Sequence, residues 1–414
     1  MQWRSSSQNQ TILRVNKLAK KILISDPTLR DGNHAVRHQL SRESFIAYCK
    51  AAEAAGVPIV EVGHGNGLGA SSMLVGECRL SDEEILTISR SNLSKSKLGI
   101  HVIPGFCTIK SDLSKAIDLG VDVFRIASHC TEADITDRHI AYVRKSGKEA
   151  FGVLMMSHMA SPAILLEEAK KMESYGAEAI IIMDSAGAYF PSDVTERIST
   201  LVDGLSIPVG FHGHNNLGMA IINSVSAVNA GATMIDGTIR GFGAGAGNTQ
   251  LEVLVAVFEK LGFETGIDLY KILDAADIAE KEFNPVAPHI SPMSIVSGLS
   301  GVFSGSHLVW VRHTGKGMIP SGTIRLSSLP DPIKVLETNG APALVSLLEK
   351  GDNYFLVIVN KDFVNNINLV FYADESVKKV LKDGTLVPAS SYQSAQELDP
   401  GDAAIYMFPK SKQK

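Results

Sequence analysis

Short apolar runs alternate with longer segments of helical pattern between residues 22 and 240. The runs are rich in β-branched and aromatic residues and are bounded by polar or glycine-containing stretches. Near-continuous apolar strands that alternate with helices are typical of a parallel sheet covered by helices. The pattern predicts strands at residues 22–26, 59–63, 98–103, 123–127, 151–157, 179–184, 209–214 and 234–240.

The longer segments carry start and stop signals for helices. A Ser-x-Glu sequence opens the segment 41–55, which ends before Gly56, and the segment 162–175 ends before Gly176. Eight strand–helix units fit a closed (β/α)8 barrel better than an open doubly wound sheet. We therefore predict an α/β chain with a TIM barrel over residues 22–308.

The composition changes at about Gly315, where Gly, Pro and Ser cluster, and residues 309–330 are predicted to be a linker. Short β-rich runs then alternate with Asn, Asp and Gly turns, which predicts a small antiparallel β-sandwich over residues 331–414. This part resembles the β-sandwich that ends many glycoside hydrolases. Packing or dimerisation is its expected role, with carbohydrate contact as the alternative. The predicted strands are residues 323–326, 354–360, 367–372, 385–387 and 403–408.

Composition and charge restrict the class of partner. The chain has 414 residues, 45% hydrophobic and 20% charged, which is an ordinary soluble globular mixture. A net charge of -5 and the lack of a basic run interleaved with aromatic residues argue against nucleic acid. No apolar run is long enough to span a bilayer, so no membrane partner is expected. A small molecule is the expected partner.

The four cysteines and the first residues bear on location. Cys49, Cys78, Cys107 and Cys130 have no C-x-x-C spacing, so we expect reduced thiols rather than a disulfide framework or a zinc knuckle. Residues 1–21 are basic and contain no acidic residue, and we interpret them as a disordered extension rather than a transit peptide. The expected location is cytoplasmic.

The sequence His212-Gly213-His214 at the end of a predicted strand is the most informative chemical feature. Side chains alternate along a strand, so both imidazoles point the same way and can reach one metal ion. Asp31, which follows the first predicted strand, can supply a carboxylate. Two imidazoles and one carboxylate leave open positions on a divalent ion for a substrate. The alternative is a pair of histidines with no metal role.

Polar residues follow five of the predicted strands, where barrel active sites are built. Each of them alone is more often a structural polar group, but their shared place at strand ends is hard to explain by chance. We therefore expect them to meet at one mouth of the barrel. They are Arg30, Asp31, Glu61, His64, Ser157, His158, Asp184, Ser185, His212 and His214.

Five segments resemble the 4-hydroxy-2-oxovalerate aldolases, which are metal-dependent pyruvate aldolases in the barrel superfamily that also holds hydroxymethylglutaryl-CoA lyase. The resemblance covers residues 22–308. His34 is its sharpest mark, because the acyl-CoA branches generally carry Gln at that point. The segments are 26–34 (DPTLRDGNH), 61–69 (EVGHGNGLG), 155–159 (MMSHM), 184–188 (DSAGA) and 210–218 (GFHGHNNLG).

The resemblance implies a class II aldolase that cleaves a 4-hydroxy-2-oxoacid to pyruvate and an aldehyde, as in aromatic hydrocarbon catabolism. Asp31, His212 and His214 would bind the metal, Mn²⁺ most often, with Mg²⁺ or Co²⁺ as alternatives. The metal would chelate the 2-oxoacid and stabilise the enolate that cleavage leaves. Arg30 would hold the same developing charge, His34 would take the proton of the C4 hydroxyl, and Ser185 would contact the substrate.

Two departures from the family pattern leave the partner and the function open, and one loop offers a further candidate metal ligand. Phe303 stands where many members have a Tyr that helps to protonate the enolate. The C-terminal segment that docks an acylating aldehyde dehydrogenase is missing, which makes that partner doubtful. In the acyl-CoA relatives an Asn of the glycine-rich loop 241–248 joins the metal shell, so Asn248 is a candidate fourth ligand. The alternative functions are an acyl-CoA carbon–carbon lyase or synthase and a noncatalytic fusion protein. Homo-oligomerisation is also open.

Overall fold

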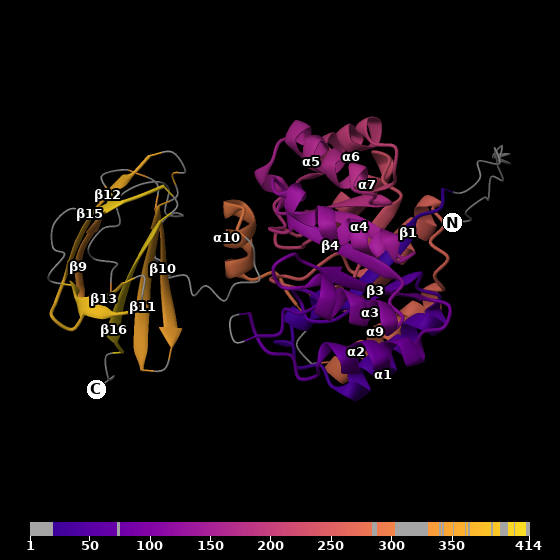
Figure 1. Cartoon of the computed structure of the whole chain (residues 1–414), viewed down its shortest axis with the longest axis horizontal. Coiled ribbons are helices and arrows are strands. Elements are labelled where there is room, and N and C mark those ends of the chain that lie inside the picture. The colour runs from indigo at the N-terminus through magenta and orange to yellow at the C-terminus, as the bar shows by residue number, and fades with distance from the viewer. Residues whose placement is uncertain are drawn as a thin grey trace, which may run out of the picture. The chain divides into compact units, whose positions relative to one another are not determined.

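A computed structural model shows two compact units, residues 1–305 and 306–414 (Figure 1). Most of the predicted N-terminal extension and linker, and the predicted strand 323–326, lie outside the described residues. Within the described part of the chain, no helix combines the length and the apolar character needed to cross a membrane. The structure describes residues 20–72, 75–283, 288–302, 330–338, 341, 343–350, 352–360, 362, 365–381, 384–389, 396–400 and 402–410.

The first unit is a closed barrel of eight parallel strands in the order β1 to β8, which confirms the predicted TIM barrel. Helices surround the strands, with α5, α6 and α7 on one side and α1 and α2 on the opposite side in Figure 1. The strands are β1 (Leu23–Leu29), β2 (Ile59–Val62), β3 (Lys97–Val102), β4 (Val123–His129), β5 (Glu149–Met155), β6 (Ala179–Asp184), β7 (Val209–Gly213) and β8 (Met234–Asp236).

The predicted helix signals work as expected. Ser41 caps the first helix by accepting a hydrogen bond from the Ser44 N–H, and Gly56 ends it in the left-handed conformation at φ 79°. Ser161 caps the fifth helix in the same way, ahead of a proline at the first helical position. The helices are α1 (Arg42–Ala55), α2 (Asp82–Asn92), α3 (Ser114–Asp118), α4 (Asp137–Lys145), α5 (Pro162–Ser174), α6 (Pro191–Gly204), α7 (Ala220–Asn229), α8 (Leu251–Leu261), α9 (Leu269–Phe283) and α10 (Pro292–Ser300).

Two strand ends differ from the prediction by more than two residues. β1 continues to Leu29, three residues beyond the predicted end, because its partner β2 keeps pairing with it as far as Leu29. β8 ends at Asp236 instead of Arg240. The chain then turns through a short 3-10 helix at Ile239–Gly241, in which Arg240 has φ 51°. This turn was not predicted, because apolar and β-branched residues are frequent in the segment 234–240 and favour a strand.

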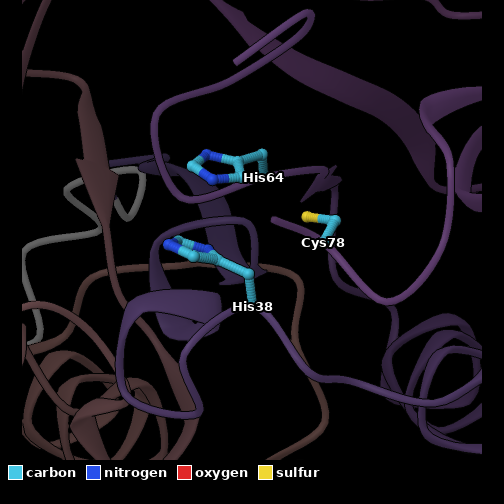
Figure 2. A group of neighbouring side chains, drawn as sticks. All are labelled: His38, His64 and Cys78. Carbon is cyan, nitrogen blue, oxygen red and sulfur yellow. The ribbon is translucent and has the colours of Figure 1, made fainter. Parts of the chain in front are cut away.

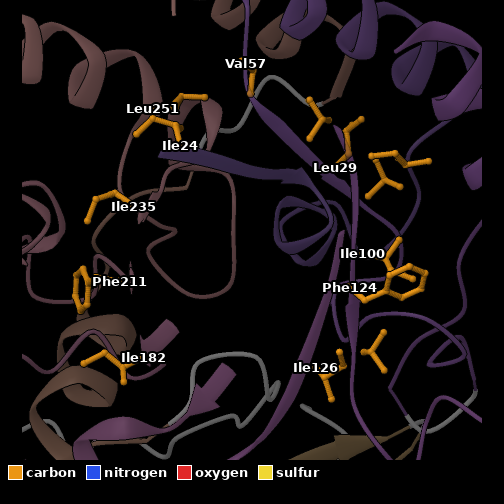
Figure 3. Close-up of a cluster of buried hydrophobic side chains, with 14 of the residues drawn as sticks. Ile24, Leu29, Val57, Ile100, Phe124, Ile126, Ile182, Phe211, Ile235 and Leu251 are labelled. Atoms are coloured by element: carbon orange, nitrogen blue, oxygen red, sulfur yellow. The ribbon is translucent and has the colours of Figure 1, made fainter. Parts of the chain in front are cut away.

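The barrel has an outer and an inner layer of side chains. Apolar residues on the outer face, among them Leu29, Phe124 and Phe211, pack under the helices and are almost fully buried (Figure 3). The inner face holds a separate cluster that includes Val123 and Met234. Because side chains alternate along a strand, polar residues in the positions between the outward-facing apolar residues also point inward. These inward polar residues include Glu61, His101, Arg125, His212 and Asp236.

The second unit has a five-stranded sheet, β10-β11-β16-β13-β14, and a three-stranded sheet, β15-β12-β9, both antiparallel. The rings of Phe371 and Tyr406 stack 3.7 Å apart and join the two sheets, which confirms the predicted antiparallel sandwich. The strands are β9 (Ile333–Glu337), β10 (Ala343–Lys350), β11 (Asn353–Asn360), β12 (Ile367–Ala373), β13 (Lys378–Val380), β14 (Leu386–Pro388), β15 (Gln396–Leu398) and β16 (Ala403–Pro409).

Four of these strands, β9, β10, β13 and β15, were not predicted. The sequence of β10, Ala-Leu-Val-Ser-Leu-Leu-Glu-Lys, is dominated by residues that favour helices. Continuous pairing with β11 along its whole length overrides that local preference. The other three are at most five residues long, too short to show a periodic pattern.

Candidate metal centre

Asp31, His212 and His214 meet at the carboxyl ends of β1 and β7, and one donor atom from each lies within 4.8 Å of the others. All three side chains are buried. The two histidines face each other through their Nε2 atoms, which are 3.3 Å apart. Two nitrogen ligands, each about 2.1 Å from one ion, lie roughly 3 Å apart. The group therefore fits a divalent metal ion, as the His-x-His spacing predicts.

Neighbouring side chains orient two of these ligands. His212 Nδ1 lies 2.8 Å from Asp236 Oδ2, so its Nε2 is directed toward the other ligands. Asn248 Nδ2 donates a hydrogen bond of 2.6 Å to Asp31 Oδ2. Asn248 Oδ1 is buried and has no hydrogen-bond partner among the described residues. An oxygen in that position suits the fourth-ligand role predicted for Asn248.

The protonation states also suit a metal. Burial would raise the pKa of Asp31, but the Arg30 guanidinium and the nearby His214 and His34 imidazoles hold it well below its usual range. Burial lowers the pKa of His214 to about 4, against the opposing effect of Asp31. At neutral pH these groups are a carboxylate and a neutral imidazole, the forms that bind metal ions.

Arg30 lies directly against this group. Its Nη1 donates to Asp31 Oδ1 at 2.8 Å and to the Gly65 carbonyl at 3.2 Å, and its Nε donates to Glu61. The Arg30 Nη2 atom is buried without a hydrogen-bond partner among the described residues. A buried guanidinium N–H without an acceptor costs free energy in the protein without substrate. It can donate a strong hydrogen bond to an anionic oxygen of a bound molecule.

His34 ends the short 3-10 helix Asp31–His34 and is half-buried. Burial lowers its pKa to about 4, and Asp31 opposes that effect. The imidazole is therefore neutral at physiological pH and can accept a proton. Its ring lies against the Gly65 backbone, where a Cβ on Gly65 would come within 2.4 Å of His34 Nε2.

This close approach gives a test of how His34 is positioned. Gly65→Ala should displace the His34 ring and lower turnover by roughly 10- to 100-fold, the scale of a small misplacement of a catalytic group. Metal affinity should be unchanged, because Gly65 is not a ligand. Steady-state rates and titration of Mn²⁺ measure the two effects. In the control Gly204→Ala the three atoms nearest to the added carbon all belong to the flexible Leu166 side chain, so wild-type turnover is expected. Equal rates for both variants would contradict the placement of His34.

Ser185 follows β6 at the same end of the barrel and is 4% exposed. Its Oγ accepts a hydrogen bond of 3.0 Å from the Met156 N–H. The preceding Asp184 accepts hydrogen bonds from the Ala188 and Tyr189 amides, and burial raises its pKa to about 6. Asp184 therefore shapes the loop that carries Ser185. Phe303 lies outside the described residues.

Three inward-pointing residues near the centre were not predicted as site residues: His101, Arg125 and Asp236. All three are nearly fully buried, and His101 Nδ1 has no hydrogen-bond partner among the described residues. His101 lies close enough to Arg30 for that charge to lower its pKa, after burial itself. A polar residue on the inward face of an otherwise apolar strand is the sequence signal that could have identified them.

A second group of ligand-type side chains, His38, His64 and Cys78, lies in the loops beside His34 (Figure 2). The His38 and His64 rings are stacked, with centroids 3.8 Å apart and an interplanar angle of 17°. Lone pairs in parallel planes do not converge on one ion. His64 Nδ1 accepts from the Asn66 N–H, and its Nε2 lies 3.0 Å from the Gly76 carbonyl. This group therefore fits a metal less well than Asp31, His212 and His214.

The sequence of the barrel is similar to those of known enzymes. Residues 21–279 match the HMGL-like family, which places the chain in that class of barrel enzymes. It is 82% identical over 288 residues to the 4-hydroxy-2-oxovalerate aldolase of Pectobacterium atrosepticum, covering 70% of this chain and 84% of the relative. It is 65% identical to the enzyme of the same name from Spirochaeta aurantia, covering 69% and 83%. The chain belongs to the 4-hydroxy-2-oxovalerate aldolase family and is a carbon–carbon lyase.

Solved structures share the barrel. The N-terminal domain of a Bacteroides vulgatus protein assigned as an aldolase has a TM-score of 0.60 and 26% identity, covering 68% of this chain and 93% of that domain. The carboxyl transferase domain of Rhizobium etli pyruvate carboxylase, solved with pyruvate and biocytin, has a TM-score of 0.56 and 17% identity, covering 66% of this chain and 49% of that one. The second likeness is one of fold alone.

Proposed function

We propose that the protein is a divalent-metal-dependent class II aldolase that cleaves a 4-hydroxy-2-oxoacid, such as 4-hydroxy-2-oxovalerate, to pyruvate and an aldehyde. The observation that carries the proposal is the convergence of Asp31, His212 and His214 beside an Arg30 guanidinium with an unpaired donor. The names of the relatives and the metal-ligand geometry support the same reaction class.

Asp31, His212 and His214 would hold the metal, with Asn248 as a candidate fourth ligand. When bound, a divalent ion supplies Lewis-acid stabilisation to the negative charge that cleavage leaves on the pyruvate fragment. Oxygen and imidazole donors without a thiolate suit Mn²⁺, Mg²⁺ or Co²⁺, and we propose Mn²⁺ as the native ion.

Three side chains of the protein carry out the other steps of the proposed reaction. His34, neutral at physiological pH, accepts the proton of the C4 hydroxyl as the C3–C4 bond breaks and the aldehyde carbonyl forms. The electron pair of that bond passes to the pyruvate fragment as an enolate. A proton from solvent then adds to its C3 carbon to give pyruvate, while His34 returns the proton that it accepted to solvent. Arg30 Nη2 donates to the negatively charged oxygen, in a buried site where such a hydrogen bond is strong. Ser185 contacts the substrate from the end of β6.

Other partners follow from the same proposal. The substrate is a small 2-oxoacid, and neither nucleic acid nor membrane is a partner. Because the family's usual docking segment is missing, the aldehyde leaves into solvent and no stable complex with an acylating aldehyde dehydrogenase forms. Cys49, Cys78, Cys107 and Cys130 are all free, which suits the reducing cytoplasm.

The decisive experiment is product analysis with the full chain and Mn²⁺. We expect equimolar pyruvate and aldehyde from 4-hydroxy-2-oxovalerate, detected by lactate dehydrogenase and alcohol dehydrogenase coupling. 3-Hydroxy-3-methylglutaryl-CoA, offered at the same concentration, should not be cleaved. Cleavage of the thioester with no pyruvate from the oxoacid would assign the chain to the acyl-CoA reaction instead.

A further inference from the structure

A buried set of ion pairs lies inside the barrel, with Arg125 of β4 at its centre. Arg125 Nη2 donates a hydrogen bond of 2.6 Å to Asp236 of β8, and Arg125 Nη1 lies 2.9 Å from Glu61 Oε2 of β2. The Arg125 side chain is 1% exposed. It follows Val123, a member of the inner apolar cluster, by two residues, so its guanidinium shares the barrel interior with that cluster.

Both arms of this set reach the metal-ligand group. On one side, Asp236 Oδ2 accepts from Arg125 and also lies 2.8 Å from His212 Nδ1. On the other side, Glu61 pairs with Arg30 Nε, and Arg30 Nη1 donates to Asp31. Arg125 is therefore joined to His212 through one carboxylate and to Asp31 through a carboxylate and a guanidinium.

We propose that Arg125 is a positioning residue for the metal centre, a role that rests on the proposed metal-dependent function. One planar guanidinium pairs with two carboxylates, through a hydrogen bond to Asp236 and an ion pair with Glu61, and each carboxylate contacts a group of the centre. Asp236 fixes the ring plane of His212 and directs its Nε2 toward the ion. Glu61 fixes Arg30, which in turn holds Asp31.

The alternative is that Arg125 only neutralises buried carboxylates and so stabilises the fold. A lysine at position 125 would distinguish the two roles. A lysine keeps the positive charge, but its single ammonium cannot make the forked contacts that orient both carboxylates at once. The substitution Arg125→Lys therefore separates positioning from charge.

The test measures Mn²⁺ binding to the metal-free full chain by calorimetry, well below the unfolding temperature. Arg125→Lys should weaken Mn²⁺ binding by about 10- to 100-fold, the usual effect of disturbing groups that orient metal ligands. Arg90→Lys is the matched control. Arg90 also makes forked contacts, to Asp122 and two carbonyls, but it lies on α2, away from the centre. Its substitution should leave Mn²⁺ affinity unchanged.

A second variant tests the path through Asp236. Asp236→Asn should weaken Mn²⁺ binding to a similar degree, and the double variant with Arg125→Lys should lose less than the product of the two single effects. Asp236→Asn also keeps the test decisive if Arg125→Lys fails to fold. Wild-type Mn²⁺ affinity in the folded variants, or multiplicative losses, would overturn the positioning role while leaving the proposed function intact. A wild-type chain that binds no divalent ion would overturn the proposed function itself.

Discussion

Exhaustive removal of divalent metal from the full chain should abolish pyruvate release, and added Mn²⁺ should restore it, with Mg²⁺ and Co²⁺ less effective. Metal stabilisation of a developing charge supplies several kcal/mol, so its loss corresponds to roughly 1,000-fold or more in rate. The candidate ligands are side chains at the ends of β1 and β7, and the barrel has an extensive apolar core of its own, so we expect the fold to be kept when the ion is removed. The measurement is pyruvate formation before and after chelation, with circular dichroism to show that the fold is kept.

Asp31→Asn provides the matching substitution, because it keeps the shape of the side chain and removes its charge. We expect it to lose both Mn²⁺ binding and activity. Asp26→Asn is the control: Asp26, on β1, is also buried, but it accepts its hydrogen bonds from Thr28 and Tyr48. That variant should keep its metal affinity even if it is less stable. Full activity in the metal-free protein would exclude the mechanism.

The barrel could be predicted because its strands are largely apolar and several of its helices carry cap signals in the sequence. Ser41 and Gly56, for example, define α1 from local signals alone. What the sequence could not show depends on contacts between distant segments. β10 has a helical composition and becomes a strand only because β11 offers a full-length partner. β8 ends early because the chain turns at Arg240, whose positive φ has no signature in the sequence.

The convergence of the three candidate metal ligands was predictable for a related reason. The spacing of His212 and His214 fixes their common direction on a strand, and Asp31 follows another strand of the same barrel. Arg125 and Asp236 were missed because what distinguishes them is a hydrogen bond across the barrel between residues far apart in the chain. The resemblance to a known family pointed to the candidate ligands Asp31, His212 and His214 but not to the residues that contact them.

His34→Ala should lower the rate of cleavage by roughly 100-fold or more, the usual effect of losing a general base, while Mn²⁺ affinity stays near wild type. The physical reason is that His34 is neutral at physiological pH and lies next to Asp31 without belonging to the ligand group. Turnover and Mn²⁺ titration measure the two effects. His289→Ala, which removes an exposed histidine, is the control and should have no effect on either.

The pH dependence of turnover is a further test of His34 as the base. Burial lowers the pKa of His34 to about 4, so the basic form is present above that pH and is lost as the pH falls through it. With Mn²⁺ kept saturating at each pH, wild-type turnover should stay level from pH 8 to about 5 and fall toward pH 4. The residual activity of His34→Ala should lack that acid limb, because no group at this position remains to be protonated. An unchanged rate in His34→Ala, or the same acid limb in both proteins, would assign the base to another residue.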